Sequence, residues 1–324
     1  MSMATSVSWT VRNNEVLSGI NSTNETGSGT LAPYSHTFVK TFEMVMICYF
    51  PVVIGLGTVG NSVALWHIVR PKRVLATNEV LLLDLIILDF LIIVSFLVEA
   101  INIIPAWKMR FFDYASYLVA LLNLHGSPSF MTFIAIDQYI AVAHPILFHA
   151  WRRPRYYIVL SLIIWLFVLV LTIPVFVITM PSANRACEMG HSIAMGWKIH
   201  LLFSHVILSV IPVLVLLVCY ALTANKLKEV GVGKESMKLM RKQVLKTIGA
   251  ILALLLFCFA PFHCGELFAA IMDLVYPVHA SLRLYRCYVR TCTWFLTSFA
   301  AFLNPLLYIF RSQNFQWRIR CCTV

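Results

Sequence analysis

Long apolar runs dominate this chain of 324 residues and constrain its fold more than any other feature. About 20 consecutive apolar residues are enough for a helix to cross the hydrocarbon core of a bilayer. Because unpaired backbone groups are very costly in lipid, each run is expected to be a helix. We therefore predict an all-α bundle of seven transmembrane helices at residues 42–69, 78–104, 114–142, 156–180, 196–223, 244–274 and 285–310.

Two independent signals orient these helices. Asn21 and Asn24 each begin an Asn-x-Thr glycosylation acceptor, which is used only on the lumenal side of a membrane. Lys and Arg gather in the loops after the first, third and fifth spans, most densely at residues 226–246, and such loops face the cytoplasm. We predict a multi-pass plasma-membrane protein with an extracellular, glycosylated N-terminal tail at residues 1–41.

The expected organisation is completed by the bundle at residues 42–310 and a short cytoplasmic segment at 311–324. Residues 312–320 form an amphipathic stretch that predicts a short eighth helix on the inner surface. Cys321 and Cys322 follow it directly, a context that suits palmitoylation, with plain reduced thiols as the alternative. The net charge of +11 is assigned to basic loops facing anionic lipid, so no nucleic-acid partner is expected.

Four polar residues lie inside the expected spans, where they are expensive and usually functional. They are Asn61, Asp89, Ser127 and Asn304. If the bundle closes, they converge on one hole that suits a sodium ion or a proton; a satisfied polar cluster without an ion is the alternative. Pro305 follows Asn304, and because proline removes a backbone donor, the last span is expected to break there.

Histidines occur on three different spans. His125, His205 and His263 show no close spacing such as His-x-x-x-His, so the sequence predicts no metal site. Neutral, hydrogen-bonded imidazoles are the simpler interpretation. A role in sensing pH is a hypothesis that the ordinary titration range of histidine allows.

The order of polar, proline and aromatic residues across the spans resembles that of rhodopsin-like G-protein-coupled receptors. The resemblance covers about residues 42–322 and includes an Asn-Pro-x-x-Tyr sequence in the last span. The matching residues are Asn61, Asp89, Trp165, Pro174, Pro212, Tyr220, Pro261, Asn304, Pro305 and Tyr308, together with Pro145, seven residues after Gln138. No single one of these residues identifies the family, but all of them in order across seven spans do.

This resemblance implies a mechanism in which ligand binding opens the cytoplasmic face of the bundle to a heterotrimeric G protein. Pro145 and Ile146 would contact that G protein. The residues expected to switch between the closed and open states are Asp137, Gln138, Tyr139, Tyr220, Phe259, Pro261, Asn304, Pro305 and Tyr308.

The chain departs from the family in three places. The family usually has Asp-Arg-Tyr where this chain has Asp137-Gln138-Tyr139, and Arg241 supplies no acidic partner, so the usual inner ionic restraint is missing. The cysteine that normally ties the third span to an outer loop is also missing, leaving Cys187 either free or paired with Cys287. Phe259 stands where the family more often has tryptophan, and phenylalanine is common there in the nucleotide and lipid-mediator branch. Residues 152–155 resemble the corresponding stretch of Mas-related receptors.

The resemblance also implies a ligand pocket between the outer halves of the spans. Ala120 replaces the aspartate of amine receptors, so a biogenic amine is not expected to bind by that route. The last span lacks the lysine that binds retinal, so a light sensor is excluded. An acidic small molecule or a peptide end fits slightly better than a cation. The candidate lining residues are Glu99, Tyr117, Leu121, His205, Phe259, His263, Glu266, Arg290 and Trp294.

The function predicted from the sequence is therefore that of a receptor that transmits an extracellular signal to G proteins. The alternative is an atypical seven-helix receptor that binds without signalling, such as a scavenger or a partner subunit, because of Gln138. No clustered catalytic residues and no internal repeats are present, so an enzyme or a transporter is not expected. No cofactor is expected apart from an allosteric sodium ion.

Overall fold

The structure is a computed structural model that describes residues 31–69, 79–102, 110–151, 153–179, 195–229, 235–275, 289 and 292–307. Its elements are all helical within these ranges. In chain order they are α2 (Leu31–Val69), α3 (Glu79–Asn102), α4 (Arg110–Ala143), α5 (Pro145–Trp151), α6 (Pro154–Thr179), α7 (Met195–His205), η3 (Val206–Val210), α8 (Ile211–Lys228), α9 (Glu235–Leu254), η4 (Leu255–Phe259) and α10 (Ala260–Val275). A shorter apolar helix at Cys292–Leu307 follows them.

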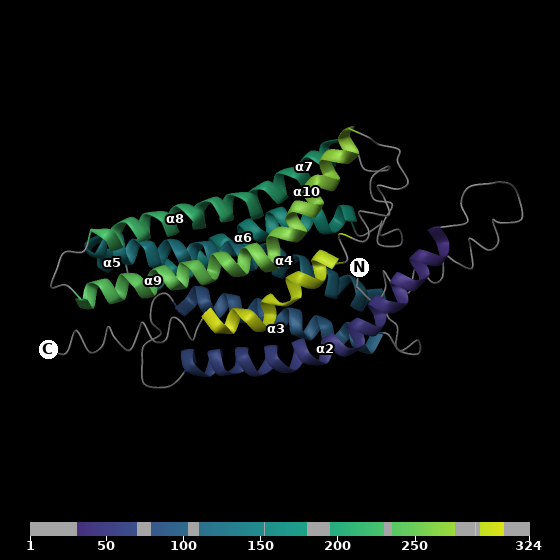
Figure 1. The fold of residues 1–324 in the computed structure, drawn as a ribbon, viewed down its shortest axis with the longest axis horizontal. Helices are drawn as coiled ribbons and strands as arrows, with labels where there is room; N and C mark the ends of the chain where they lie inside the picture. The colour runs from purple at the N-terminus through teal and green to yellow at the C-terminus, as the bar shows by residue number, and fades with distance from the viewer. Residues whose placement is uncertain are drawn as a thin grey trace, which may run out of the picture.

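The predicted bundle is confirmed. In the described part of the chain, six helices are long and apolar enough to cross a membrane, and Cys292–Leu307 supplies a shorter seventh. Figure 1 shows the long helices lying side by side along one direction, with α8 beside α9 and α2 on the opposite edge of the bundle. The predicted amphipathic helix at residues 312–320 lies outside the described residues.

Two helices extend well beyond the apolar runs. The first begins at Leu31, not at residue 42, so the end of the predicted N-terminal tail is helical. The sixth span begins at Glu235, not at residue 244. Both differences have one cause: hydropathy marks the part of a helix that lies in lipid, whereas backbone hydrogen bonds continue into water where no proline or glycine ends them.

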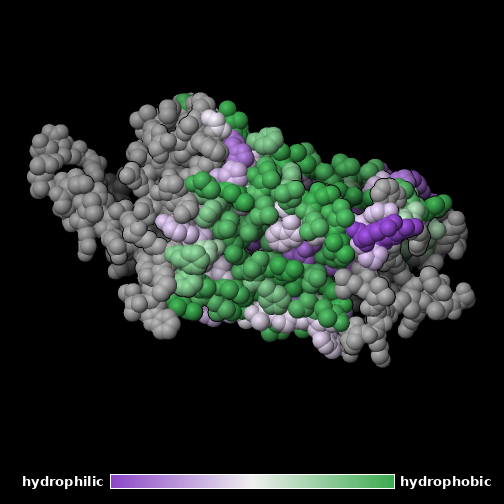
Figure 2. Space-filling view, turned by 180° about the vertical axis from the view of Figure 1, so that it is seen from behind, coloured by the Kyte–Doolittle hydropathy of each residue, from purple (hydrophilic) through white to green (hydrophobic). Residues whose placement is uncertain are grey.

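The central helix of the bundle is α4. It packs against α3, α6, α8 and α9. In the most apolar stretch of α4, 78% of the residues are buried, against 28% in that of α2 and 33% in that of α6. The exposed sides of the peripheral helices carry large apolar side chains, including Val59, Leu162 and Leu166. Figure 2 shows a largely hydrophobic band across the middle of the visible face, as expected for a surface that meets lipid.

Short π-helical turns interrupt the fifth and sixth spans. In each case a proline follows directly: Pro212 lies at the start of α8 after η3, and Pro261 lies at the start of α10 after η4. A proline ring clashes with the carbonyl four residues earlier, which is that of Leu208 or Phe257. Both carbonyls lie within the π turns, which widen the helix at the point of conflict.

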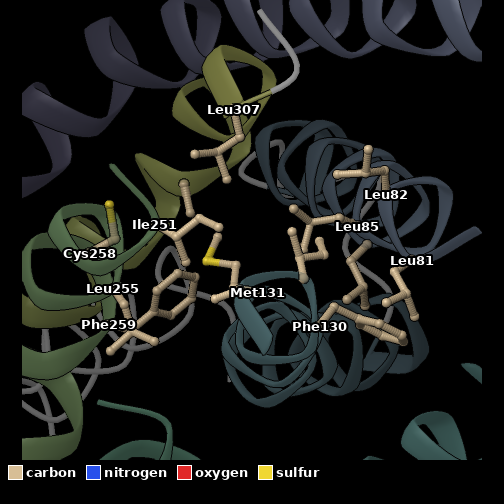
Figure 3. Packing of buried hydrophobic residues seen from close by; sticks show 14 of the residues in the cluster. Leu81, Leu82, Leu85, Phe130, Met131, Ile251, Leu255, Cys258, Phe259 and Leu307 are labelled. Atoms are coloured by element: carbon tan, nitrogen blue, oxygen red, sulfur yellow. The ribbon is translucent and has the colours of Figure 1, made fainter. Parts of the chain in front are cut away.

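The main apolar core joins α3 and α4 to η4 and the last helix. Figure 3 shows Met131 reaching from α4 between Leu85 on one side and Ile251 and Phe259 on the other, with Leu307 above them. These side chains are buried, and Phe259 has no exposed surface. The core therefore links the helix that carries Asn304 to the π turn before Pro261.

Candidate functional site

Two of the four predicted polar residues, Asp89 and Asn304, meet inside the bundle. The side-chain amide of Asn304 donates a hydrogen bond of 2.9 Å to Oδ1 of Asp89, which joins the last helix to α3. Asn61 donates from Nδ2 to the carbonyl oxygens of Gly57, at 3.0 Å, and Ala301, at 2.8 Å. Asp89, Asn304, Asn61 and the nearby Ser127 are all fully buried.

Several oxygens in this cluster have no hydrogen-bond partner. They are Oδ2 of Asp89, Oγ of Ser127, and Oδ1 of both Asn61 and Asn304. Buried polar atoms are normally paired, so unpaired ones require an explanation. Carboxylate, hydroxyl and amide oxygens are hard ligands of the kind that alkali cations prefer, and the net negative charge of one carboxylate suits a monovalent ion.

Asn123 is a member of this site that the sequence did not reveal. It lies on α4, one turn before Ser127, with Nδ2 at 3.4 Å from the carbonyl oxygen of Leu88, and it also acts as a donor to Asp89. The spacing of four residues from Ser127 is the signal that could have identified it, because residues i and i+4 share a helix face.

The three histidines meet, although their spacing in the sequence gave no sign of this. His125 on α4, His205 at the end of α7 and His263 on α10 have ring centroids 5.4 to 6.5 Å apart. Nδ1 of His205 lies 3.1 Å from Nδ1 of His263. Nδ1 of His125 lies 2.8 Å from Oγ1 of Thr172 on α6. In the described part of the chain no group of three or more His, Cys, Asp or Glu has a geometry that could hold a metal ion.

A group of aromatic rings adjoins the histidines. Tyr117 stacks on Trp294 at 6.2 Å between centroids and lies 6.0 Å from Phe176. Phe262 meets Trp294 edge to face at 5.3 Å and lies 5.8 Å from the ring of His263. Tyr117, Trp294 and His263 were predicted to line one pocket, and this chain of contacts brings them together; Phe176 and Phe262 were not predicted.

The other predicted pocket residues fall into separate groups. Leu121 and Phe259 belong to the buried apolar core and are packed within it. Glu99 is buried on α3, and Glu266 is half-buried on α10, three residues after His263. Arg290 lies outside the described residues.

At the opposite end of the bundle, Asp137 accepts a hydrogen bond from the hydroxyl of Tyr157 on α6. Gln138 is buried beside it. Nη1 of Arg241 on α9 donates to the carbonyl oxygen of Lys226 near the end of α8, so this guanidinium holds the fifth and sixth spans together. Neither contact was predicted from the sequence.

Comparison with known proteins decides the family. The model of the family described as 7 transmembrane receptor (rhodopsin family) matches residues 60–308. The chain belongs to this family. It is therefore a rhodopsin-like G-protein-coupled receptor, a multi-pass protein of the plasma membrane and not an enzyme, as the sequence predicted.

Curated relatives of this receptor are similar over most of their length. Somatostatin receptor type 4 of Rattus norvegicus is 27% identical over 87% of this chain and 75% of its own. Somatostatin receptor type 2 of Mus musculus is 25% identical over 90% of this chain and 79% of its own. N-formyl peptide receptor 2 of Pan troglodytes is 26% identical over 91% of this chain and 87% of its own.

The expected switch residues of the receptor occupy distinct positions. Tyr139 meets the ring of His144 edge to face, with centroids 6.3 Å apart, and Tyr220 on α8 lies against Gly249 on α9. Pro305 is buried and lies against Gly60 of α2. Tyr308 lies outside the described residues.

Pro145 and Ile146 begin the short helix α5 and are exposed; the side chain of Ile146 is 87% accessible. An apolar side chain so accessible at the end of the bundle is available to a protein partner. The predicted glycosylation sites Asn21 and Asn24, the predicted palmitoylation sites Cys321 and Cys322, and the pair Cys187 and Cys287 lie outside the described residues.

Proposed function

We propose that this receptor binds a peptide at the outer end of the bundle and activates a heterotrimeric G protein at the opposite end. The observation that carries the ligand class is the likeness to somatostatin and N-formyl peptide receptors over more than four fifths of the chain. Trp294, which is only partly buried and packs on Tyr117 and Phe262, offers an aromatic contact for a peptide side chain.

The proposed orientation has the N-terminus outside the cell and Asn21 and Asn24 glycosylated. The end that carries Asp137, Arg241 and Ile146 then faces the cytoplasm, with Cys321 and Cys322 as palmitoylation sites. The basic segment between residues 226 and 246 supports this orientation, because such segments remain on the cytoplasmic side.

A sodium ion is the proposed allosteric ligand of the polar cluster. Asp89 would provide its charge, with oxygens from Ser127 and Asn304. The unpaired buried oxygens of these three residues support the proposal, because a cation would satisfy them. The ion would supply a positive charge that holds α3, α4 and the last helix together.

Activation would shift a two-state equilibrium of the bundle. The sixth span, made of α9, η4 and α10, would bend at η4 and Pro261, where a π turn already interrupts the regular hydrogen bonding. Movement of its inner end would separate α9 from α8, break the contact between Arg241 and Lys226, and expose a surface next to Ile146. Tyr220 and Tyr308 would then stabilise the open state.

The ligand prefers a free carboxylate at one end if the positive charge of Arg290 faces the pocket, as the sequence predicts. Pairs of synthetic peptides that differ only in a free or an amidated C-terminus test this preference. Stronger signalling by the free acids is expected. Equal potency for acid and amide would remove the acidic preference and leave the peptide class intact.

A second candidate function is a receptor that binds without signalling, and Gln138 is the observation that favours it. The decisive experiment measures basal signalling of the wild type and of Gln138→Arg through every G-protein family, at matched surface expression. We expect basal activity in the wild type, because Gln138 cannot form the family's usual ion pair with Asp137, and less in Gln138→Arg. A silent wild type with an active Gln138→Arg would favour the second candidate.

A further inference from the structure

The cluster of His125, His205 and His263 has no part in the function proposed above. It lies where three spans meet, and its members are almost fully buried, with exposed fractions of 0%, 7% and 2% in that order. Nε2 of His125 and Nε2 of His263 have no hydrogen-bond partner. Three imidazoles in mutual contact inside a membrane protein are unusual, because ionisable residues there are costly unless they serve a function.

The contact between His205 and His263 constrains the number of protons. Two Nδ1 atoms 3.1 Å apart make a good hydrogen bond only if one carries a hydrogen and the other a lone pair. A doubly protonated pair would place two N–H groups and two positive charges face to face. Because the ring centroids are only 5.4 Å apart, protonation of both rings would force α7 and α10 apart.

Among the described residues, a backbone hydrogen bond with Leu124 partly offsets a charge on His263. His125 faces the hydroxyl of Thr172 on α6, and from the fifth span it faces His205. The ionisable groups that act on His263 are His205 and His125. Within eight residues of one of the three histidines, the described elements carry the titratable residues Tyr117 on α4, Lys198 and His200 on α7, Cys258 in η4, and Cys264 and Glu266 on α10. The last helix contributes the neutral ring of Trp294 through Phe262.

Among the described residues that lie within eight positions of a cluster histidine, Glu266 is the only carboxylate. It lies three residues beyond His263, which is about 4.5 Å further along the helix axis. Its half-buried side chain can lower the repulsion at His263 but not that between His125 and His205, which come from other helices. A single added proton is therefore tolerated more easily than two.

We propose that this histidine cluster is a proton-binding site through which acidification changes the conformational state of the receptor. Neutral imidazoles hold α4, α7 and α10 together through the contact between His205 and His263. Protonation of both His205 and His263 breaks that contact and separates the outer part of α10 from α7. The inference concerns a second ligand, the proton, and holds whether or not the principal ligand is a peptide.

The position of the cluster explains how such a change would reach the rest of the molecule. His205 is the last residue before the π turn η3, and His263 lies one turn after Phe259, which ends the π turn η4. Both histidines of the pair thus lie next to the π turns that interrupt the fifth and sixth spans. Separating them acts directly on the segment around Pro261.

The first test uses the purified full-length receptor in lipid nanodiscs and follows thermal unfolding by tryptophan fluorescence between pH 7.5 and pH 5.0. An unfolded histidine binds protons near its ordinary pKa of about 6.5. The folded cluster resists a second and third proton, so the stability that it contributes is present above that pH and is lost as the pH falls. We expect the midpoint to fall by on the order of 5 °C.

The variants His205→Gln and His263→Gln keep a polar side chain and cannot titrate, and their combination is expected to remove at least half of this shift. His200→Gln is the matched control, since it removes a histidine of α7 that lies outside the cluster. Nε2 of His200 lies 3.4 Å from Oγ of Ser204. If His200→Gln flattens the pH profile as much as the double variant, the assignment to the cluster is wrong.

The second test does not depend on the folding of the variants. In wild-type receptor with selectively ¹⁵N-labelled histidine, the nuclear resonances of the cluster report protonation directly, in the presence of a metal chelator. The proposal expects conversion to imidazolium together with a change in the resonances of neighbouring residues between pH 7.5 and pH 5.0. Resonances that stay neutral and unchanged over this range would overturn it, and so would a pH response that disappears when the chelator is added.

Signalling gives a third, separate readout. External pH is changed from 7.4 to 6.0 at constant cytoplasmic pH, and basal G-protein activation is compared in wild type and double variant. We expect a change of about two-fold in the wild type, whose direction identifies the state that the neutral cluster favours, and none in the double variant. If the receptor proves silent towards G proteins, the unfolding and resonance measurements still decide the proposal.

Discussion

The hydroxyl of Tyr157 donates a hydrogen bond to the carboxylate of Asp137, and this contact joins α6 to α4 at the end of the bundle that carries Gln138. In the family the carboxylate at this position usually pairs with a neighbouring arginine, whose place is taken here by Gln138. A tyrosine from another helix thus takes over part of the arginine's role. A phenol is neutral, so this hydrogen bond is not itself an ion pair.

Removing this hydroxyl is expected to weaken the resting state. Tyr157→Phe removes one hydrogen-bond donor from the buried Asp137, and a hydrogen bond to a charged group contributes roughly 1.5–3 kcal/mol. Basal signalling should rise, and the unfolding temperature should fall. Tyr156→Phe is the control, because that ring is exposed and next in sequence. Equal basal activity in both variants and wild type would show that the contact does not restrain the receptor.

Sodium dependence tests the polar cluster. With sodium chloride in place of choline chloride, the wild-type receptor is expected to unfold at a higher temperature, because a bound cation stabilises the folded state. Asp89→Asn should abolish this difference. The matched control is Asp84→Asn on the same helix, whose carboxylate instead accepts a bond of 3.0 Å from Nε1 of Trp165. A sodium effect that survives in Asp89→Asn would exclude this site.

The packing of α2 against α3 and the last helix is tight enough to discriminate between two glycines. A Cβ on Gly57 would lie 2.9 Å from Cδ1 of Ile93 and 3.3 Å from the carbonyl oxygen of Ala301, whereas one on Gly55 meets nothing within 4 Å. Gly57→Ala is therefore expected to destabilise the receptor by about 1–3 kcal/mol. Gly55→Ala should be neutral or slightly stabilising. Thermal unfolding of the two variants measures the difference.

Two phenylalanines of η4 give a matched pair for the core. Phe259 has no exposed surface, whereas Phe257 is 53% exposed on the outside of the bundle. Phe259→Ala leaves a cavity next to Met131 and should cost about 3–5 kcal/mol. Phe257→Ala should cost much less, because lipid fills the space and is as apolar as the side chain that was removed. Similar losses in both variants would contradict the described packing.

Hydropathy alone was sufficient to predict the helices, because the lipid requirement acts on every residue of a span. The convergence of Asp89 and Asn304 was also predictable, since a buried carboxylate must find partners among the polar residues of other spans. Residues such as Tyr117 and Trp294 were assigned to one pocket by family resemblance, and their ring contact agrees with it.

Contacts that depend on the rotation of one helix against another could not be predicted. Tyr157 is one of two adjacent tyrosines, and only the phase of α6 decides that it, and not Tyr156, reaches Asp137. The three histidines are separated by long stretches of sequence, so their meeting depends on the packing of α4, α7 and α10. The extension of α2 to Leu31 was missed because hydropathy does not register where a helix ends in water.

The π turn at Leu255–Phe259 also affects how this receptor should be aligned with its relatives. A π turn holds an extra residue, and one residue corresponds to about 100° of rotation in a regular helix. Suppose that residues are matched one by one through this turn to a relative whose helix is uninterrupted. Every residue beyond the turn is then matched to one that lies on a different face of the relative's helix. A gap of one residue within Leu255–Phe259 restores the register, and binding-site comparisons that include Phe259 and His263 need it.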